Sequence, residues 1–327
     1  MRSHFQQTIA TSQFSLPCFV LIGLLIWLFI PAKDTNAWNI ADYGLWTLMP
    51  KSLQTGHIGI ALGILFTTAT VYAMVEFSNS MVLLNTNSRM LSCTLTLLMA
   101  LSLCLHKFQP VHIIMFCSII SYFTLFGSYQ NESPAHSFAT HLMIATASLV
   151  FPKFIFFSVL AWLIQLYLNA FSPQVFFASL FAMAVPYWFF FTYTVCSDQI
   201  DLFTQIIHEI IDIKRPSIAD IGLLQWIAAF YIALTFLSGV INFILTNSND
   251  RIRQRSIFTT FIFHGFIVIF MAFMMTKCFN VFLGLLAIDA AIIGGRFWVV
   301  TNNRFTHFFF IIMALLAAIV LALSFNI

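Results

Sequence analysis

Long apolar stretches recur along nearly the whole 327-residue chain, and they limit what it can fold into. A run of about 18 or more apolar residues crosses the hydrocarbon core of a membrane as a helix. The runs are continuous and do not alternate with polar residues, so they predict spanning helices and exclude a β-barrel. We expect eleven spans, with a range of nine to twelve, at about 14–30, 58–84, 90–106, 111–128, 137–151, 154–171, 174–195, 219–245, 257–276, 279–300 and 305–325.

The composition supports an integral membrane protein. Hydrophobic residues make up 61% of the chain and charged residues 8%, against about 45–50% and 25% in soluble domains. So few charges cannot cover the surface of a soluble protein of this size, and a net charge of +3 does not supply a basic face for nucleic acid. We therefore predict a single all-α membrane domain over residues 1–327.

The two stretches around Pro152 differ from the other expected spans. The first is short, and Lys153 follows the proline directly. Proline removes a backbone donor and breaks a helix, so we expect a kinked or re-entrant hairpin here. Pro186 is expected to bend or end a second helix for the same reason.

Positive charge in the connecting loops predicts the orientation. One side receives Arg2, Arg89, Arg296, Arg304 and the cluster Arg251–Arg253–Arg255. The other side receives Lys33, Lys51, Lys107, Lys153, Lys214, Arg215 and Lys277. Each side receives seven positive charges, so their number does not determine the orientation. We therefore use the dense triple-arginine loop, which the rule places in the cytoplasm. It places the amino terminus in the cytoplasm and the carboxyl terminus in the periplasm. One span more or fewer near Pro152 would move the carboxyl-terminal half of the chain to the other side of the membrane relative to the first four helices.

Residues 197–215 predict an amphipathic helix in the outer interface. Isoleucine and phenylalanine recur at helical spacing, while Asp201, His208, Glu209 and Asp212 lie on the other face. Such a helix either shields the underlying spans or forms a gate or platform over a cavity, with Asp201, His208 and Asp212 facing a substrate.

The outer loop at 32–57 carries Asp34 and Asp42 among aromatic residues. Aromatic residues between polar ones are typical of a segment resting on lipid headgroups. The alternative is catalytic, because membrane glycosyltransferases of the C superfamily use an acid in their first outer loop. Asp34 and Asp42 occupy that position, without a paired acidic motif.

Apart from Asp220, at the outer boundary of its span, three charged residues fall within the predicted spans: Glu76, Asp289 and Arg296. A charge in hydrocarbon costs about 2.5–3.5 kcal/mol on insertion scales, so it usually has a partner or faces water. Arg296 lies two turns after Asp289 on the same helix face, which predicts an Asp289–Arg296 or a Glu76–Arg296 pair. A protonatable relay and a lipid-headgroup site are the alternatives. His141 and His264 are expected to be interhelical hydrogen-bonding groups.

No cofactor or metal site is indicated. The cysteines are scattered without metal-ligand spacing, and no nucleotide-binding or hydrolase motif is present. We therefore expect membrane lipids and a membrane-protein partner as ligands, and neither nucleic acid nor nucleotide. The six cysteines are Cys18, Cys93, Cys104, Cys117, Cys196 and Cys278.

Two apolar motifs resemble a known family. Ser148-Leu149-Val150-Phe151-Pro152 is followed by an apolar helix, and then by Ala178-Ser179-Leu180 through Pro186-Tyr187-Trp188. This pattern resembles an uncharacterised family of multi-pass inner-membrane proteins of Gram-negative bacteria, although Lys153 and Met183 depart from it. The resemblance covers about a quarter of the chain. It implies a bacterial inner-membrane protein and carries over no catalytic residue.

Three hypotheses of function follow. The first is a non-catalytic or lipid-handling component of envelope biogenesis. The second is a glycosyltransferase or polymerase acting on a lipid-linked sugar. The third is a proton-coupled transporter or flippase, which requires Asp289 to line a wet cavity. A sealed Asp289 that bonds to Arg296 or to a hydroxyl would count against the third hypothesis.

Overall fold

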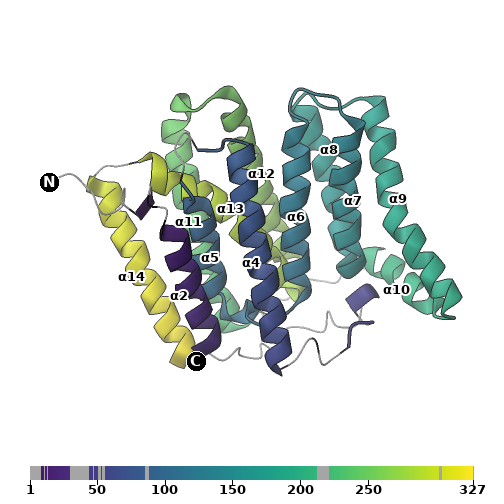
Figure 1. Ribbon diagram of the computed structural model, residues 1–327, viewed down its shortest axis with the longest axis horizontal. Helices are drawn as coiled ribbons and strands as arrows, with labels where there is room; N and C mark the ends of the chain where they lie inside the picture. The colour runs from purple at the N-terminus through teal and green to yellow at the C-terminus, as the bar shows by residue number, and fades with distance from the viewer. Residues whose placement is uncertain are drawn as a thin grey trace.

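The protein is an all-helical bundle over the residues that the structure describes (Figure 1). The computed structural model describes residues 9–10, 12, 14–29, 44–46, 48–50, 53, 56–84, 88–211, 221–301 and 304–326. Its α-helices are α2 (Ser15–Phe29), α4 (Gly56–Ser80), α5 (Met90–Leu101), α6 (Pro110–Gly127), α7 (Pro134–Val150), α8 (Phe157–Tyr167), α9 (Pro173–Cys196), α10 (Ile200–Ile211), α11 (Leu223–Thr246), α12 (Ile252–Met274), α13 (Phe279–Val300) and α14 (Arg304–Asn326).

Seven segments are long and apolar enough to cross a membrane: α4, α6, α9, α11, α12, α13 with its preceding turn, and α14. The expected eleven spans are not confirmed by this criterion. The helices α2, α5, α7 and α8 have 15, 12, 17 and 11 residues, all below the 18 residues of this criterion.

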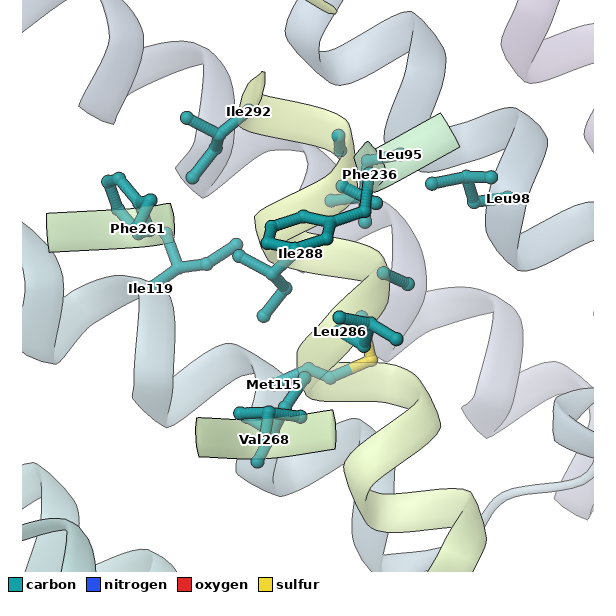
Figure 2. Packing of buried hydrophobic residues seen from close by; sticks show 14 of the residues in the cluster. Leu95, Leu98, Met115, Ile119, Phe236, Phe261, Val268, Leu286, Ile288 and Ile292 are labelled. Carbon is teal, nitrogen blue, oxygen red and sulfur yellow. The ribbon is translucent and has the colours of Figure 1, made fainter. Parts of the chain in front are cut away.

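Helix α13 forms the centre of the bundle and is buried along its membrane-spanning window. Figure 2 shows side chains from four other helices around it: Leu95 from α5, Met115 from α6, Phe236 from α11 and Phe261 from α12. All four are at most 1% exposed. Because every face of α13 meets protein, each polar group on it must find its partner inside the bundle.

Gly294 and Gly295 allow two helices to approach α13 closely. A Cβ on Gly295 would lie 2.7 Å from the Leu91 Cα of α5, and one on Gly294 would lie 2.7 Å from the Thr235 Cγ2 of α11. Small residues at such contacts are typical of membrane bundles. The backbones of α5 and α11 therefore lie close to α13 here, and the neighbouring Arg296 is buried.

We predict that Gly295→Ala lowers the free energy of unfolding by about 1–3 kcal/mol, since overpacking displaces backbone. Thermal unfolding in detergent measures the change. The control is Gly222→Ala, whose new Cβ would meet only Gln225 Oε1 at 3.5 Å. Equal stability of the two variants would contradict the close packing of α5 on α13.

The bundle has two ends, which we name by their polar residues. At the arginine end, Arg253 Nη2 donates to the Phe126 carbonyl oxygen (3.3 Å), and Gln254 Nε2 donates to the Val82 oxygen (2.6 Å). The α4–α5 connection, the end of α6 and the start of α12 therefore meet there. At the glutamine end, Asn280 bonds Gln225 (2.7 Å) and Gln109 (3.3 Å), so that α6, α11 and α13 all begin there.

The chain breaks at Pro152, as the sequence predicts. Helix α7 ends at Val150, and a 3₁₀ helix, η4 (Pro152–Phe156), leads into α8. Pro186 does not end its helix, because α9 continues through it from Pro173 to Cys196. The helix tolerates this proline where neighbouring groups satisfy the freed backbone.

Candidate intramembrane site

Asp289 and His264 form a buried pair at the midpoints of α13 and α12. The distance from His264 Nδ1 to Asp289 Oδ2 is 2.7 Å, and the two side chains are 2% and 0% exposed. Each residue lies about 15 Å of helix rise or more from either end of its helix. His264 is therefore an interhelical hydrogen-bonding group, as expected.

Tyr122 of α6 extends this pair to a triad. Its hydroxyl lies 2.8 Å from His264 Nε2, and its ring meets the imidazole edge to face. A neutral imidazole that donates from Nδ1 to the carboxylate accepts the tyrosine hydroxyl proton at Nε2. The three side chains thus form one line of proton donors and acceptors across three helices.

The second carboxylate oxygen of the triad has no hydrogen bond. Asp289 Oδ1 has no partner among the described residues, although it is fully buried. A buried charged oxygen without a donor is costly. The site therefore favours an added proton or an ordered water at this position.

A small cavity borders the triad on the side of α6, α7 and α8. Its volume is about 20 Å³, and its walls include Tyr122, His264, Ser118, Ser121 and Thr140. A cavity needs roughly 10–15 Å³ and two to four polar partners to hold one water. This cavity meets both conditions.

Arg296 pairs with Asp250, which corrects the expected Asp289–Arg296 pair. Its Nε donates to Asp250 Oδ2 at 3.0 Å, and its Nη1 donates to Thr246 Oγ1 at 3.1 Å. The guanidinium also lies over the rings of Phe243 and Phe258. Seven residues of helix separate Arg296 from Asp289 by about 10 Å along the axis, so each reaches a neighbour at its own level.

Glu76 makes no pair with Arg296, which corrects the other expected pair. Its side chain is exposed on α4, four residues before the end of that helix at Ser80. A position so close to the helix end lets a charged side chain extend to the interface. Glu76 therefore needs no internal cation.

We predict that Asp250→Asn lowers the free energy of unfolding by about 3–5 kcal/mol, because it leaves the buried Arg296 guanidinium without its anion. Glu76→Gln, the matched carboxylate-to-amide control, should leave stability nearly unchanged. Chemical unfolding in mixed micelles measures both. A larger loss in Glu76→Gln than in Asp250→Asn would restore the pairing that the structure contradicts.

The amphipathic helix α10 is attached to η4 by a second buried ion pair. Lys153 Nζ lies 3.1 Å from Glu209 Oε1, and these side chains are 5% and 10% exposed. The sequence placed Glu209 on the polar face, and the structure buries it because Lys153 rises from the Pro152 break beneath α10. Asp201 and His208 are exposed.

The candidate catalytic residues do not form a site in the described part of the chain. Asp201 and His208 lie on the exposed surface of α10, while Asp34, Asp42 and Asp212 lie outside the described residues. Among the residues searched, no group of three or more His, Cys, Asp or Glu side chains could hold a metal ion.

We predict that Lys153→Met releases α10, since it leaves the Glu209 carboxylate buried without its cation. Amide hydrogen exchange over residues 200–211 should become faster. The double variant Lys153→Met/Glu209→Leu removes both charges and should recover most of the protection. Unchanged exchange in the single variant would show that apolar packing alone holds α10.

An apolar groove lies between α2, α4 and α5. Its volume is about 190 Å³, and its walls include Val20 and Gly23 of α2, Thr67 and Val71 of α4, and Thr96 of α5. The α4 wall extends from Ile64 to Val75, about 16 Å of helix. This length is about half of the roughly 30 Å hydrocarbon core of a membrane.

Comparison with known proteins adds no further assignment. A scan against protein families found no match, and a search of curated proteins found none either. The resemblance based on the Pro152 and Pro186 motifs therefore stays a prediction.

Sequence reasoning missed Tyr122 and the pairing of His264 with Asp289. One signal was available, because α12 and α13 are adjacent in sequence and each has one titratable residue near its midpoint. No comparable signal marked Tyr122, one of eight tyrosines in an aromatic-rich chain.

Proposed function

We propose that the protein is a proton-coupled membrane protein that moves lipid-like molecules. The observation that carries this proposal is the partner of Asp289. An intramembrane acid paired with arginine stays a carboxylate, whereas one paired with histidine bonds to a ring that can accept and release a proton. Since Arg296 is engaged by Asp250, no permanent cation holds Asp289 in the charged form.

The state described here is closed to bulk water. Asp289 is fully buried rather than lining a wet cavity, and its bonding partner is neither Arg296 nor a hydroxyl. The burial of Asp289 thus counts against transport, while its pairing with His264 supports transport. Proton exchange in this proposal takes place through His264 and Tyr122, which do border a water-sized cavity.

The groove between α2, α4 and α5 supports a lipid-like cargo. It is lined almost wholly by apolar atoms and is as long as one leaflet is deep. An acyl chain matches both properties. A lipid-handling component of envelope biogenesis, without proton coupling, is the second candidate, and this same groove favours it.

The proposed topology has eleven crossings with the arginine end in the cytoplasm. In this proposal the shorter segments α2, α5, α7 and η4–α8 cross the membrane together with the seven long apolar helices. The proposal places the Arg251–Arg253–Arg255 cluster in the cytoplasm by the positive-inside rule, which puts the amino terminus inside and the carboxyl terminus outside. The bacterial inner membrane is the proposed location and rests on the family resemblance.

The glycosyltransferase alternative has less support. A catalytic acid must come within hydrogen-bond reach of its substrate. Its candidate acids, Asp34 and Asp42, lie outside the described residues, while Asp201 and His208 are exposed on α10 and line none of the cavities described above.

The proposal is tested by lipid translocation in proteoliposomes. A phospholipid with a fluorescent acyl chain should cross between leaflets faster when a pH gradient is imposed. Asp289→Asn should abolish this acceleration, because an amide cannot exchange the proton, while the control Glu76→Gln retains it. Acceleration that persists in Asp289→Asn, or translocation that ignores the gradient, would contradict proton coupling.

The groove has its own test. A diazirine-bearing phospholipid should cross-link to the segment from Ile64 to Val75, and Gly23→Leu should reduce the yield severalfold by filling the groove. The control is Leu21→Ala, since Leu21 is exposed and does not line the groove. Equal yields in the two variants would place the lipid elsewhere.

A further inference from the structure

The surroundings of the triad differ sharply between the two ends of the bundle. Towards the arginine end, hydroxyl side chains follow the cavity. Ser121 and Thr140 line it, and the Ser121 and Thr124 hydroxyls donate to the carbonyl oxygens of Ser118 and Ser121. Thr124 Oγ1 of α6 and Thr140 Oγ1 of α7 are 2.8 Å apart, and Thr140 also bonds the His136 carbonyl oxygen at 2.9 Å. Tyr122 lies five residues before the end of α6, about 8 Å of helix, so these hydroxyls cover most of the distance to the surface.

The hydroxyl series ends at the α6–α7 connection. His136 is half-buried there, and its Nδ1 lies 2.9 Å from Ser133 Oγ. A Cβ on Gly127 would lie 2.9 Å from the His136 Cδ2, so the absence of a side chain at Gly127 lets the imidazole lie over the end of α6. Glu132 in the same connection is exposed.

Towards the glutamine end, phenylalanine rings close the cavity. Phe154 of η4 and Phe157 of α8 stack with ring centroids 4.7 Å apart, and Phe157 lies against His264 at 5.5 Å. Phe151 meets Phe282 of α13 beyond them at 6.1 Å. Packed aromatic rings exclude water and offer no group that relays a proton.

We infer that the Tyr122–His264–Asp289 triad exchanges its proton with the arginine end of the bundle, along Ser121, Thr124 and Thr140. A proton delivered to the cavity water passes to the Tyr122 oxygen while Tyr122 gives its own proton to His264 Nε2. The imidazole then carries the added proton and donates from Nδ1 to Asp289. The net change is one proton gained by the triad, with no bond to carbon altered.

Few other titratable groups face this route. Tyr122 and His264 border the cavity from α6 and α12, and Asp289 lies behind His264 on α13. The cavity walls from η4 and α8 are apolar, and those from α7 are Thr140 and Ile144. At the surface end of the route the groups are His136 and Glu132, with Arg253 beside Phe126.

Only the biological role of this route rests on the proposed function. The route itself is tested without measuring lipid translocation. The measurement is the exchange of the His264 imidazole proton with bulk deuterium in lipid nanodiscs. Histidine-selective isotope labelling and nuclear magnetic resonance follow the signal, and its loss in His264→Gln assigns it. Thr140→Val and Ser121→Ala should each slow the exchange at least about tenfold, since each removes a relay hydroxyl.

Two control variants make the outcome decisive. Thr146→Val removes an exposed α7 hydroxyl that bonds only the Leu142 carbonyl oxygen, and it should leave the rate unchanged. Phe154→Ala opens the opposite side of the cavity. A rate that is insensitive to Thr140→Val and Ser121→Ala but rises in Phe154→Ala would overturn the inferred route. Thermal unfolding shows that each variant is folded. If lipid translocation is absent but the proton exchange rates change as predicted, the proposed function is contradicted and the inferred route is not.

Discussion

Each charged group on the central helix α13 must find a partner within the bundle, because no face of that helix meets lipid or water. Asp289 takes His264 and Arg296 takes Asp250, both from the α11–α12 part of the chain. Because the two pairs are separate, Arg296 keeps its charge beside Asp250, while the pair of Asp289 and His264 can exchange a proton. Arg296 with Asp250 ties the start of α12 to α13, whereas the Asp289 pair can gain or lose a proton.

These pairings also explain why the helices around α13 pack as they do. Gly294 and Gly295 bring α11 and α5 against the turn that carries Arg296. Gly265, next to His264, lies so close to Phe236 of α11 that a Cβ there would be 2.5 Å from the ring. Close contact on several sides excludes water and strengthens electrostatic attraction within each pair.

The sequence was sufficient for the helical class, the Pro152 break and an amphipathic α10. These features arise from local patterns, namely continuous apolar runs, a proline and helical periodicity. It was insufficient for the partners of Asp289, Arg296 and Glu209. Those pairings depend on which helices are neighbours. Helical spacing shows only which residues of one helix share a face, as it did for Asp289 and Arg296. Glu209 illustrates the limit, because its periodicity matched a polar face while its actual partner rises from η4.

The central claim is that Asp289 is coupled to His264 and not to Arg296, and a double-mutant cycle measures this most directly. Unfolding free energies in mixed micelles are compared for Asp289→Asn, His264→Gln, Arg296→Met and the two double variants. The account predicts an interaction energy of about 0.5–3 kcal/mol for Asp289 with His264, and one within about 0.5 kcal/mol of zero for Asp289 with Arg296. A large coupling of Asp289 to Arg296, with none to His264, would contradict it.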